Sequence, residues 1–133
     1  SAFAPELQAL IREVEEASAP KTGMVLNLAM NYGGRAELVR GARLFAQAVE
    51  RGEASPQDLT EEGFARYLYT GGQPDPDLII RPSGEQRVSN FLLWQCAYAE
   101  FVYFDILWPD FKTQDLDRAI AIYHSRQRRF GGV

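Results

Sequence analysis

Residues 78–100, LIIRPSGEQRVSNFLLWQCAYAE, decide how the rest of the chain is interpreted. The apolar run Leu78–Ile80 predicts a buried strand, and a polar turn follows it. Arg81 and Arg87 lie at the two ends of that turn, with Gly84 between them. Guanidinium groups bind phosphate groups through paired hydrogen bonds, and a glycine lets a ligand approach the backbone. The turn therefore predicts an anion-binding site.

The second part of this stretch predicts a helix and a further strand. Ser89 or Asn90 would cap a largely buried helix that runs to about Ala99, and its first N–H groups would also face the anion. Phe101–Leu107 is apolar except for Asp105 and predicts another strand. Strand, turn, helix and strand in this order are typical of a parallel sheet with a crossover helix.

Helices and strands alternate through the rest of the chain as well. The periodicity predicts a helix over 3–17, a strand over 24–30 and a helix over 36–51 that Gly52 ends, then a helical segment from Ser55 or Thr60 to about Tyr69 and a last helix over 115–129. This alternation predicts an α/β fold with a parallel sheet flanked by helices, in one domain over 1–133. Ligands bind at the carboxyl ends of such strands, where Asn31–Arg35 and Arg81–Ser89 are both expected.

The composition excludes several classes of protein. The 133 residues are 46% apolar, which is typical of a soluble globular domain. No run approaches the roughly 18 apolar residues of a membrane span, and we expect no signal peptide and a cytoplasmic location. The net charge of -4 argues against a nucleic-acid partner. The single cysteine, Cys96, excludes an internal disulfide and is expected in the core.

Each charged candidate also has a purely structural interpretation. Arg81 and Arg87 could be surface arginines that pair with a nearby carboxylate such as Glu85. Glu100 could be a solvated helix end rather than a metal ligand, and Asp105 has the same two interpretations. For the arginines we favour anion binding, because two guanidinium groups and the Ser89 hydroxyl share one turn. For Glu100 the spacing alone favours the structural interpretation.

Several long motifs resemble the cis-prenyltransferase family. They are NYGGR from Asn31, PDPDLIIR before Pro82, RPSGEQRVSNFLLWQCAYAEFVYFDILWPDF from Arg81, and RRFGG from Arg128. The resemblance covers nearly all of the chain from about Pro5. One departure is Pro82, where the family usually has threonine, so that the turn is expected to be stiffer.

The resemblance implies a reaction and a set of binding residues. The family condenses isopentenyl diphosphate with an allylic diphosphate such as farnesyl diphosphate, and forms cis double bonds. By resemblance Arg81, Arg87, Val88 and Ser89 would bind the diphosphate of isopentenyl diphosphate. Glu100 would be a ligand of Mg2+, which together with arginines would stabilise the leaving diphosphate.

The resemblance also implies a dimer and a longer protein. Arg129 and Gly131 match the family's Arg-x-Gly element, which reaches the partner's site in a homodimer. Family members are about twice this length, and the aspartate motif of their first half has no counterpart here. We therefore expect this chain to be the C-terminal half of the enzyme and to be inactive alone. Any association with membranes is expected to occur through the product. The alternative is a noncatalytic, dimerising, diphosphate-binding module that supports a separate catalytic subunit.

Overall fold

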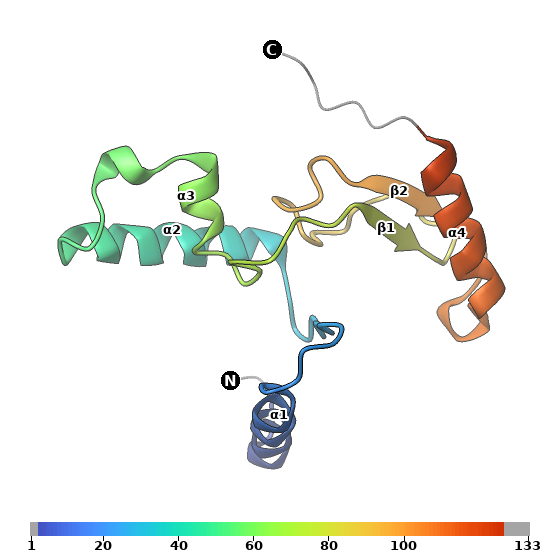
Figure 1. Cartoon of the computed structure of the whole chain (residues 1–133), viewed down its shortest axis with the longest axis horizontal. Coiled ribbons are helices and arrows are strands. Elements are labelled where there is room, and N and C mark those ends of the chain that lie inside the picture. The colour runs from blue at the N-terminus through green and yellow to red at the C-terminus, as the bar shows by residue number, and fades with distance from the viewer. Residues whose placement is uncertain (1–2, 127–133) are drawn as a thin grey trace. The chain divides into compact units, whose positions relative to one another are not determined.

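The computed structural model of the chain describes residues 3–126 and divides into two compact units. The first unit is Ser1–Tyr32 and the second is Gly33–Val133. Figure 1 shows helix α1 (Pro5–Ser18) in the first unit, and the other helices and both strands in the second. None of the helices within the described part of the chain has the length and apolar character needed to cross a membrane.

The first unit confirms the predicted helix but not the predicted strand. Helix α1 begins with Pro5 in its first turn, as expected. The apolar run Met24–Met30 forms no strand, and Met24 is 92% exposed. A strand needs a neighbour with which to exchange backbone hydrogen bonds, and residues 3–32 contain no second strand. The strand prediction for 24–30 is therefore wrong for this structure.

The second unit begins with two helices that pack against each other. Helix α2 (Gly34–Glu50) matches its prediction, and Gly52 follows it with a φ of 72°. After the 3-10 turn η1 (Pro56–Asp58) comes helix α3 (Glu61–Ala65), which is much shorter than predicted. Its cap is the predicted one, because the Gly63 N–H donates to the Thr60 hydroxyl.

The sheet is parallel, as predicted, but has two strands instead of three within the described residues. Strand β1 (Leu78–Arg81) pairs with strand β2 (Glu100–Tyr103), with Leu78 opposite Glu100 and Arg81 opposite Tyr103. Strand β2 ends four residues before the predicted Leu107 (107 minus 103). Because of this register, Arg81 and Glu100 lie at opposite ends of the sheet.

The core lies between the sheet and the last helix. Helix α4 (Thr113–Ser125) follows the 3-10 turn η2 (Trp108–Asp110) and packs against β2. Val102, Phe104 and Ala119 form the buried cluster, with Ile80 among the residues packed around it. Burial of these apolar groups is the main stabilising contribution to this half of the unit. The prediction of a helix over 115–129 agrees with α4 up to Ser125, and residues 127–129 lie outside the described part.

The predicted helix over 89–99 is replaced by a series of turns. Ser89, Asn90 and Leu92 have φ values of 50°, 64° and 45°, which a right-handed helix does not allow. Most of the turns close through hydrogen bonds to the third preceding residue, such as Phe91 N–H to the Val88 carbonyl. Burial is also partial, because Cys96 is buried whereas Leu93 and Tyr98 are exposed. The turn at residues 81–89 is therefore not followed by a helix N-terminus.

Gly84 is held in a conformation that requires glycine. Its φ is 72°, and its N–H donates to the Phe104 carbonyl. A Cβ at this position would lie 2.8 Å from the Asp105 carboxylate. Gly52 has the same φ, but a Cβ there would meet no atom within 4 Å.

We expect Gly84→Ala to lower the free energy of unfolding by about 2–3 kcal/mol. The left-handed conformation alone costs a residue with a Cβ about 1–2 kcal/mol, and Asp105 must also move. Gly52→Ala is the matched control and should show only the conformational part. Urea denaturation of both variants measures the difference. Equal destabilisation by the two substitutions would show that the Asp105 contact has no energetic effect.

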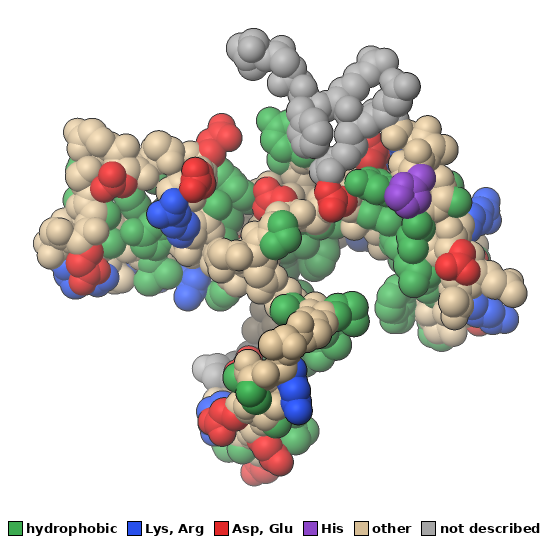
Figure 2. Space-filling model, viewed as in Figure 1, with side chains coloured by type: hydrophobic (Ala, Val, Ile, Leu, Met, Phe, Trp, Pro, Cys, Tyr) green, Lys and Arg blue, Asp and Glu red, His purple; other side chains and the backbone are tan. Residues whose placement is uncertain are grey.

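Large apolar side chains are exposed in both units. Figure 2 shows apolar groups on the visible surface, and the exposed residues include Leu26, Leu28, Leu107 and Trp108. Trp108 stacks on Phe111 at 5.5 Å, yet remains 70% exposed. Exposed apolar groups on this scale are unusual for an isolated soluble domain.

Candidate anion-binding site

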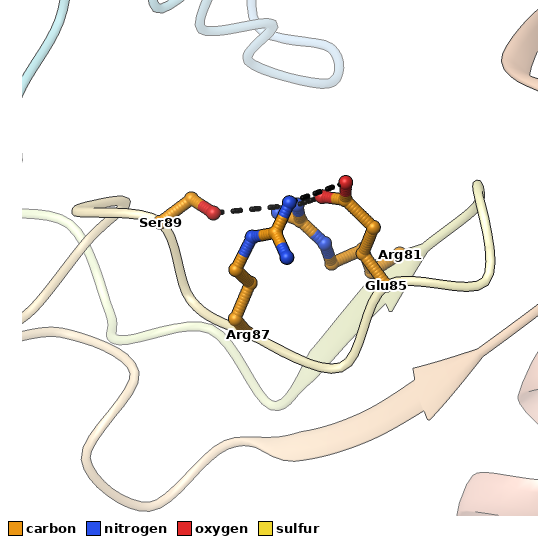
Figure 3. Close-up of polar contacts among 4 residues, drawn as sticks. All are labelled: Arg81, Glu85, Arg87 and Ser89. Carbon is orange, nitrogen blue, oxygen red and sulfur yellow. Dashed lines mark hydrogen bonds and ion pairs between the residues drawn. The ribbon is translucent and has the colours of Figure 1, made fainter.

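Two arginine side chains meet at one carboxylate on the turn that follows β1. We call residues 81–89 the arginine turn. Nη2 of Arg81 donates to Oε2 of Glu85 at 2.5 Å, and Nη2 of Arg87 donates to Oε1 at 2.5 Å (Figure 3). The ion pairing that the structural interpretation predicts is therefore present. The same arrangement brings both guanidinium groups to one point, as an anion site requires.

The three charged side chains differ in their exposure. The Arg81 side chain is 25% exposed, Glu85 38% and Arg87 68%. Nε of Arg81 is buried and has no hydrogen-bond partner. A buried N–H without an acceptor lowers the stability of the folded state. The contact with Glu85 therefore leaves one donor of Arg81 unsatisfied.

Ser89 is the last residue of the arginine turn and also lies near Arg81. Its hydroxyl lies 3.4 Å from Nη2 of Arg81, and Figure 3 shows it pointing toward the guanidinium groups. Ser83 and Ser89 both have positive φ values, 94° and 50°. Non-glycine residues rarely adopt this conformation, which is found more often at functional sites than elsewhere. Residues with positive φ thus lie on both sides of Glu85 in the turn.

A small cavity of about 80 Å³ lies beside the two arginines. Besides Arg81 and Arg87 it is lined by apolar side chains and a thiol: Ile79, Ile80, Val88, Phe91, Cys96 and Phe101. Burial raises the pKa of the Cys96 thiol, so this group is neutral and adds no charge to the cavity wall. The cavity wall thus combines two cationic side chains with apolar ones, among them Val88.

Asn90 joins the arginine turn to the start of α2. Its backbone carbonyl accepts from the Gly34 N–H at 2.7 Å, and its side-chain oxygen accepts from the Arg35 N–H at 2.9 Å. These bonds explain why Asn90 adopts the left-handed conformation instead of starting a helix. They also place Gly34 and Arg35 beside the turn, as expected, although no strand precedes them.

A buried polar network lies next to this junction. The Glu37 carboxylate is 1% exposed and accepts from the Tyr69 N–H at 2.8 Å and from the Gln95 side-chain amide at 3.1 Å. The same amide donates to the Thr70 hydroxyl at 3.1 Å. The network joins α2, the loop after α3 and the turns of 89–99. It links α2 to the turns of 89–99, which directly follow the arginine turn.

Glu100 lies away from the arginine turn and has a different partner. It is the first residue of β2, and its carboxylate accepts from Nη1 of Arg126 at 3.0 Å. The same Nη1 donates to the Phe101 carbonyl at 2.7 Å. Among residues 3–126 there is no group of three or more His, Cys, Asp or Glu that could hold a metal ion. In the described part of the chain the partner of Glu100 is thus an arginine and not a group of other metal-ligand residues.

Two predicted binding residues, Arg129 and Gly131, lie outside the described part of the chain. The sequence pattern does not single out Glu37 or Gln95, and it does not pair Arg126 with Glu100. An acidic residue in the first turn of a helix is usually explained by the helix dipole, so nothing in the sequence distinguished Glu37 from a surface residue.

Comparisons with known proteins agree on one family. Residues 1–131 match the Prenyltransf family model, described as "Putative undecaprenyl diphosphate synthase". An isoprenyl transferase of Clostridium perfringens is 56% identical over the whole chain, which covers 53% of that protein. A ditrans,polycis-undecaprenyl-diphosphate synthase of Micrococcus luteus, specific for (2E,6E)-farnesyl diphosphate, is 47% identical over 92% of the chain and 49% of its own length.

Solved structures give the same result. A lavandulyl diphosphate synthase from Lavandula x intermedia, crystallised with dimethylallyl diphosphate, matches 98% of the chain with a TM-score of 0.94 and 42% identity. A probable undecaprenyl diphosphate synthase from Campylobacter jejuni matches with a TM-score of 0.82 and 32% identity. The chain covers 56% and 59% of these two structures. It spans about half the length of the curated relatives that it matches.

Proposed function

The chain belongs to the undecaprenyl diphosphate synthase (Prenyltransf) family, and from this premise we propose that its arginine turn binds the diphosphate of isopentenyl diphosphate. In the whole protein this site would serve the condensation of isopentenyl diphosphate with an allylic diphosphate to a cis-polyprenyl diphosphate. Arg81 and Arg87 would bind the phosphate oxygens, and Ser89 would donate a further hydrogen bond.

The convergence of the two guanidinium groups is the observation that supports this proposal. Both reach the same carboxylate at 2.5 Å, so both can also reach neighbouring oxygens of one ligand. Charge-assisted hydrogen bonds of this kind are about twice as strong as neutral ones. A single carboxylate offers two oxygens, whereas a diphosphate offers more acceptors over a longer span.

The apolar cavity supports the choice of an isopentenyl diphosphate over a bare inorganic anion. It is lined by both arginines and by apolar side chains that include Val88, Phe91 and Phe101. A short branched hydrocarbon attached to a diphosphate can place its carbon atoms there while its phosphates meet the guanidinium groups. Burial of these carbon atoms would add a favourable hydrophobic contribution to binding.

The proposal for the whole protein extends beyond the described residues. It includes a homodimer in which Arg129 and Gly131 reach the partner's site, and Mg2+ with Glu100 as one ligand. It also includes a cytoplasmic enzyme whose product associates with membranes. Arg126 contacts Oε2 of Glu100, so a metal ion would bind at Oε1 or replace Arg126 at Oε2.

Replacing Arg87 with alanine tests the proposed site. We expect isopentenyl diphosphate to bind about tenfold more weakly to the variant, because one charge-assisted contact is lost at a side chain that is 68% exposed. Isothermal titration calorimetry on the full chain measures the dissociation constant. Arg51→Ala is a suitable control, since Arg51 also pairs with a glutamate, Glu53, but lies outside the turn. Equal affinities of wild type and Arg87→Ala would reject the proposed site.

A further inference from the structure

We propose that Glu85 is an internal occupant of the anion site, which the ligand must displace before it can bind both arginines. This inference rests on the function proposed above and concerns how the same site is emptied and filled. Glu85 would keep the two guanidinium groups converged while no ligand is bound. Its displacement would then lower the net affinity for any anion.

The position of Glu85 supports this role. Its two carboxylate oxygens each accept one bond, from Nη2 of Arg81 and Nη2 of Arg87 (Figure 3). A phosphate that binds both arginines through the same Nη2 groups would compete with Glu85 for these donors. A carboxylate oxygen and a phosphate oxygen cannot both accept along one N–H direction, so Glu85 and the ligand cannot share the two N–H groups that Glu85 now uses.

Glu85 is also held in a way that allows exchange. Its side chain is 38% exposed, so it can turn into water without crossing the core. Ion pairs that are partly exposed contribute little to stability, and their loss is readily offset by a stronger ligand. Glu85 also leaves the buried Nε of Arg81 without a partner. The contact with Glu85 therefore does not use all the hydrogen-bond donors of Arg81.

The charge of the site sets which ligands can compete. Arg81, Arg87 and Glu85 together carry a formal charge of about +1, whereas the arginines alone carry about +2. A monoanion would only replace one carboxylate with another group of equal charge. A diphosphate brings several negative charges and can displace Glu85 with a gain in electrostatic energy. Glu85 would thus select for highly charged ligands.

Glu85→Gln separates an internal competitor from a simple support. Glutamine keeps the shape of the side chain but removes its charge. If Glu85 competes with the ligand, inorganic pyrophosphate should bind about tenfold more tightly to the variant, which is the scale expected for the loss of one like charge near the bound anion. Calorimetry on the full chain measures this affinity. Glu62→Gln is the matched control, because Glu62 pairs with Arg66 at 2.8 Å outside the turn.

The outcomes distinguish this inference from the proposed function. Weaker or unchanged binding of pyrophosphate by Glu85→Gln, while Arg87→Ala still reduces binding, would overturn the competitor role and leave the site intact. Equal affinities of wild type and Arg87→Ala for pyrophosphate would reject the site itself.

A second measurement avoids any effect of the substitution on folding. In wild-type protein with 13C-labelled glutamate, the Glu85 side-chain carboxylate signal should move toward that of a solvated glutamate as pyrophosphate is added. A Glu85 signal that stays unchanged while the Arg81 and Arg87 side-chain signals shift would contradict displacement.

Discussion

Replacing Arg81 with alanine is expected to weaken binding of isopentenyl diphosphate about 100-fold, the largest loss for any single change in the arginine turn. Arg81 lies at the carboxyl end of β1, and only 25% of its side chain is exposed. Hydrogen bonds that involve a charged group contribute about 1.5–3 kcal/mol each, and they are stronger where water is partly excluded. The Arg81 guanidinium is also near Ser89, so its loss leaves that hydroxyl without its neighbour.

Two further variants make the Arg81 result specific. Arg81→Lys keeps the charge but not the planar fork, so we expect it to recover only part of the affinity. Arg66→Ala removes an arginine that is 71% exposed and pairs with Glu62, and it should leave binding unchanged. Titration calorimetry and thermal unfolding of each variant separate affinity from stability. Full affinity in Arg81→Lys would show that charge alone, rather than the fork geometry, binds the ligand.

Replacing Glu37 with alanine is expected to lower the free energy of unfolding by about 3 kcal/mol. The carboxylate is 1% exposed, and the substitution removes an acceptor from both the Tyr69 N–H and the Gln95 amide. Removing one partner of a buried hydrogen bond costs about 1–3 kcal/mol, and the lost side-chain volume adds a cavity contribution. The loss should be large because three separate segments depend on this one group.

Two controls establish the cause of the destabilisation. Glu37→Gln keeps an acceptor oxygen in a side chain of the same shape, so we expect it to retain most of the stability. Glu50→Ala removes an exposed glutamate from the same helix, α2, and should change stability by less than about 0.5 kcal/mol. Urea denaturation followed by circular dichroism measures all three. A loss in Glu37→Ala no greater than that in Glu50→Ala would mean that the network contributes nothing.

Much of the local structure could be predicted because local features determine it. Helices α1, α2 and α4 follow from apolar residues at helical spacing, and the caps at Thr60 and Gly52 follow from residue type. The parallel pair of strands follows from two apolar runs separated by a long crossover. The arginine turn was located because Arg81, Arg87 and Ser89 lie close together in the sequence.

The tertiary structure alone decided the conformation of segments whose local preferences were ambiguous. Residues 24–30 have the composition of a strand but no partner strand in their unit. Residues 89–99 have the composition of a helix, but Asn90 bonds the backbone at Gly34 and Arg35, which holds it in the left-handed conformation. Such bonds link residues more than 50 positions apart, and no local pattern encodes them.

The same reason explains which parts of the site were found. The sequence determined that two arginines and a serine share one turn after a strand. The pairing of Glu85 with both arginines is local, within four residues, and was one of the two interpretations that the sequence offered. Only the folded chain decided that Gln95 contacts buried Glu37 and that Arg126 contacts Glu100. Charged and polar side chains are stabilised by whichever partner the fold brings within hydrogen-bonding distance, and that partner is set by packing over long sequence separations.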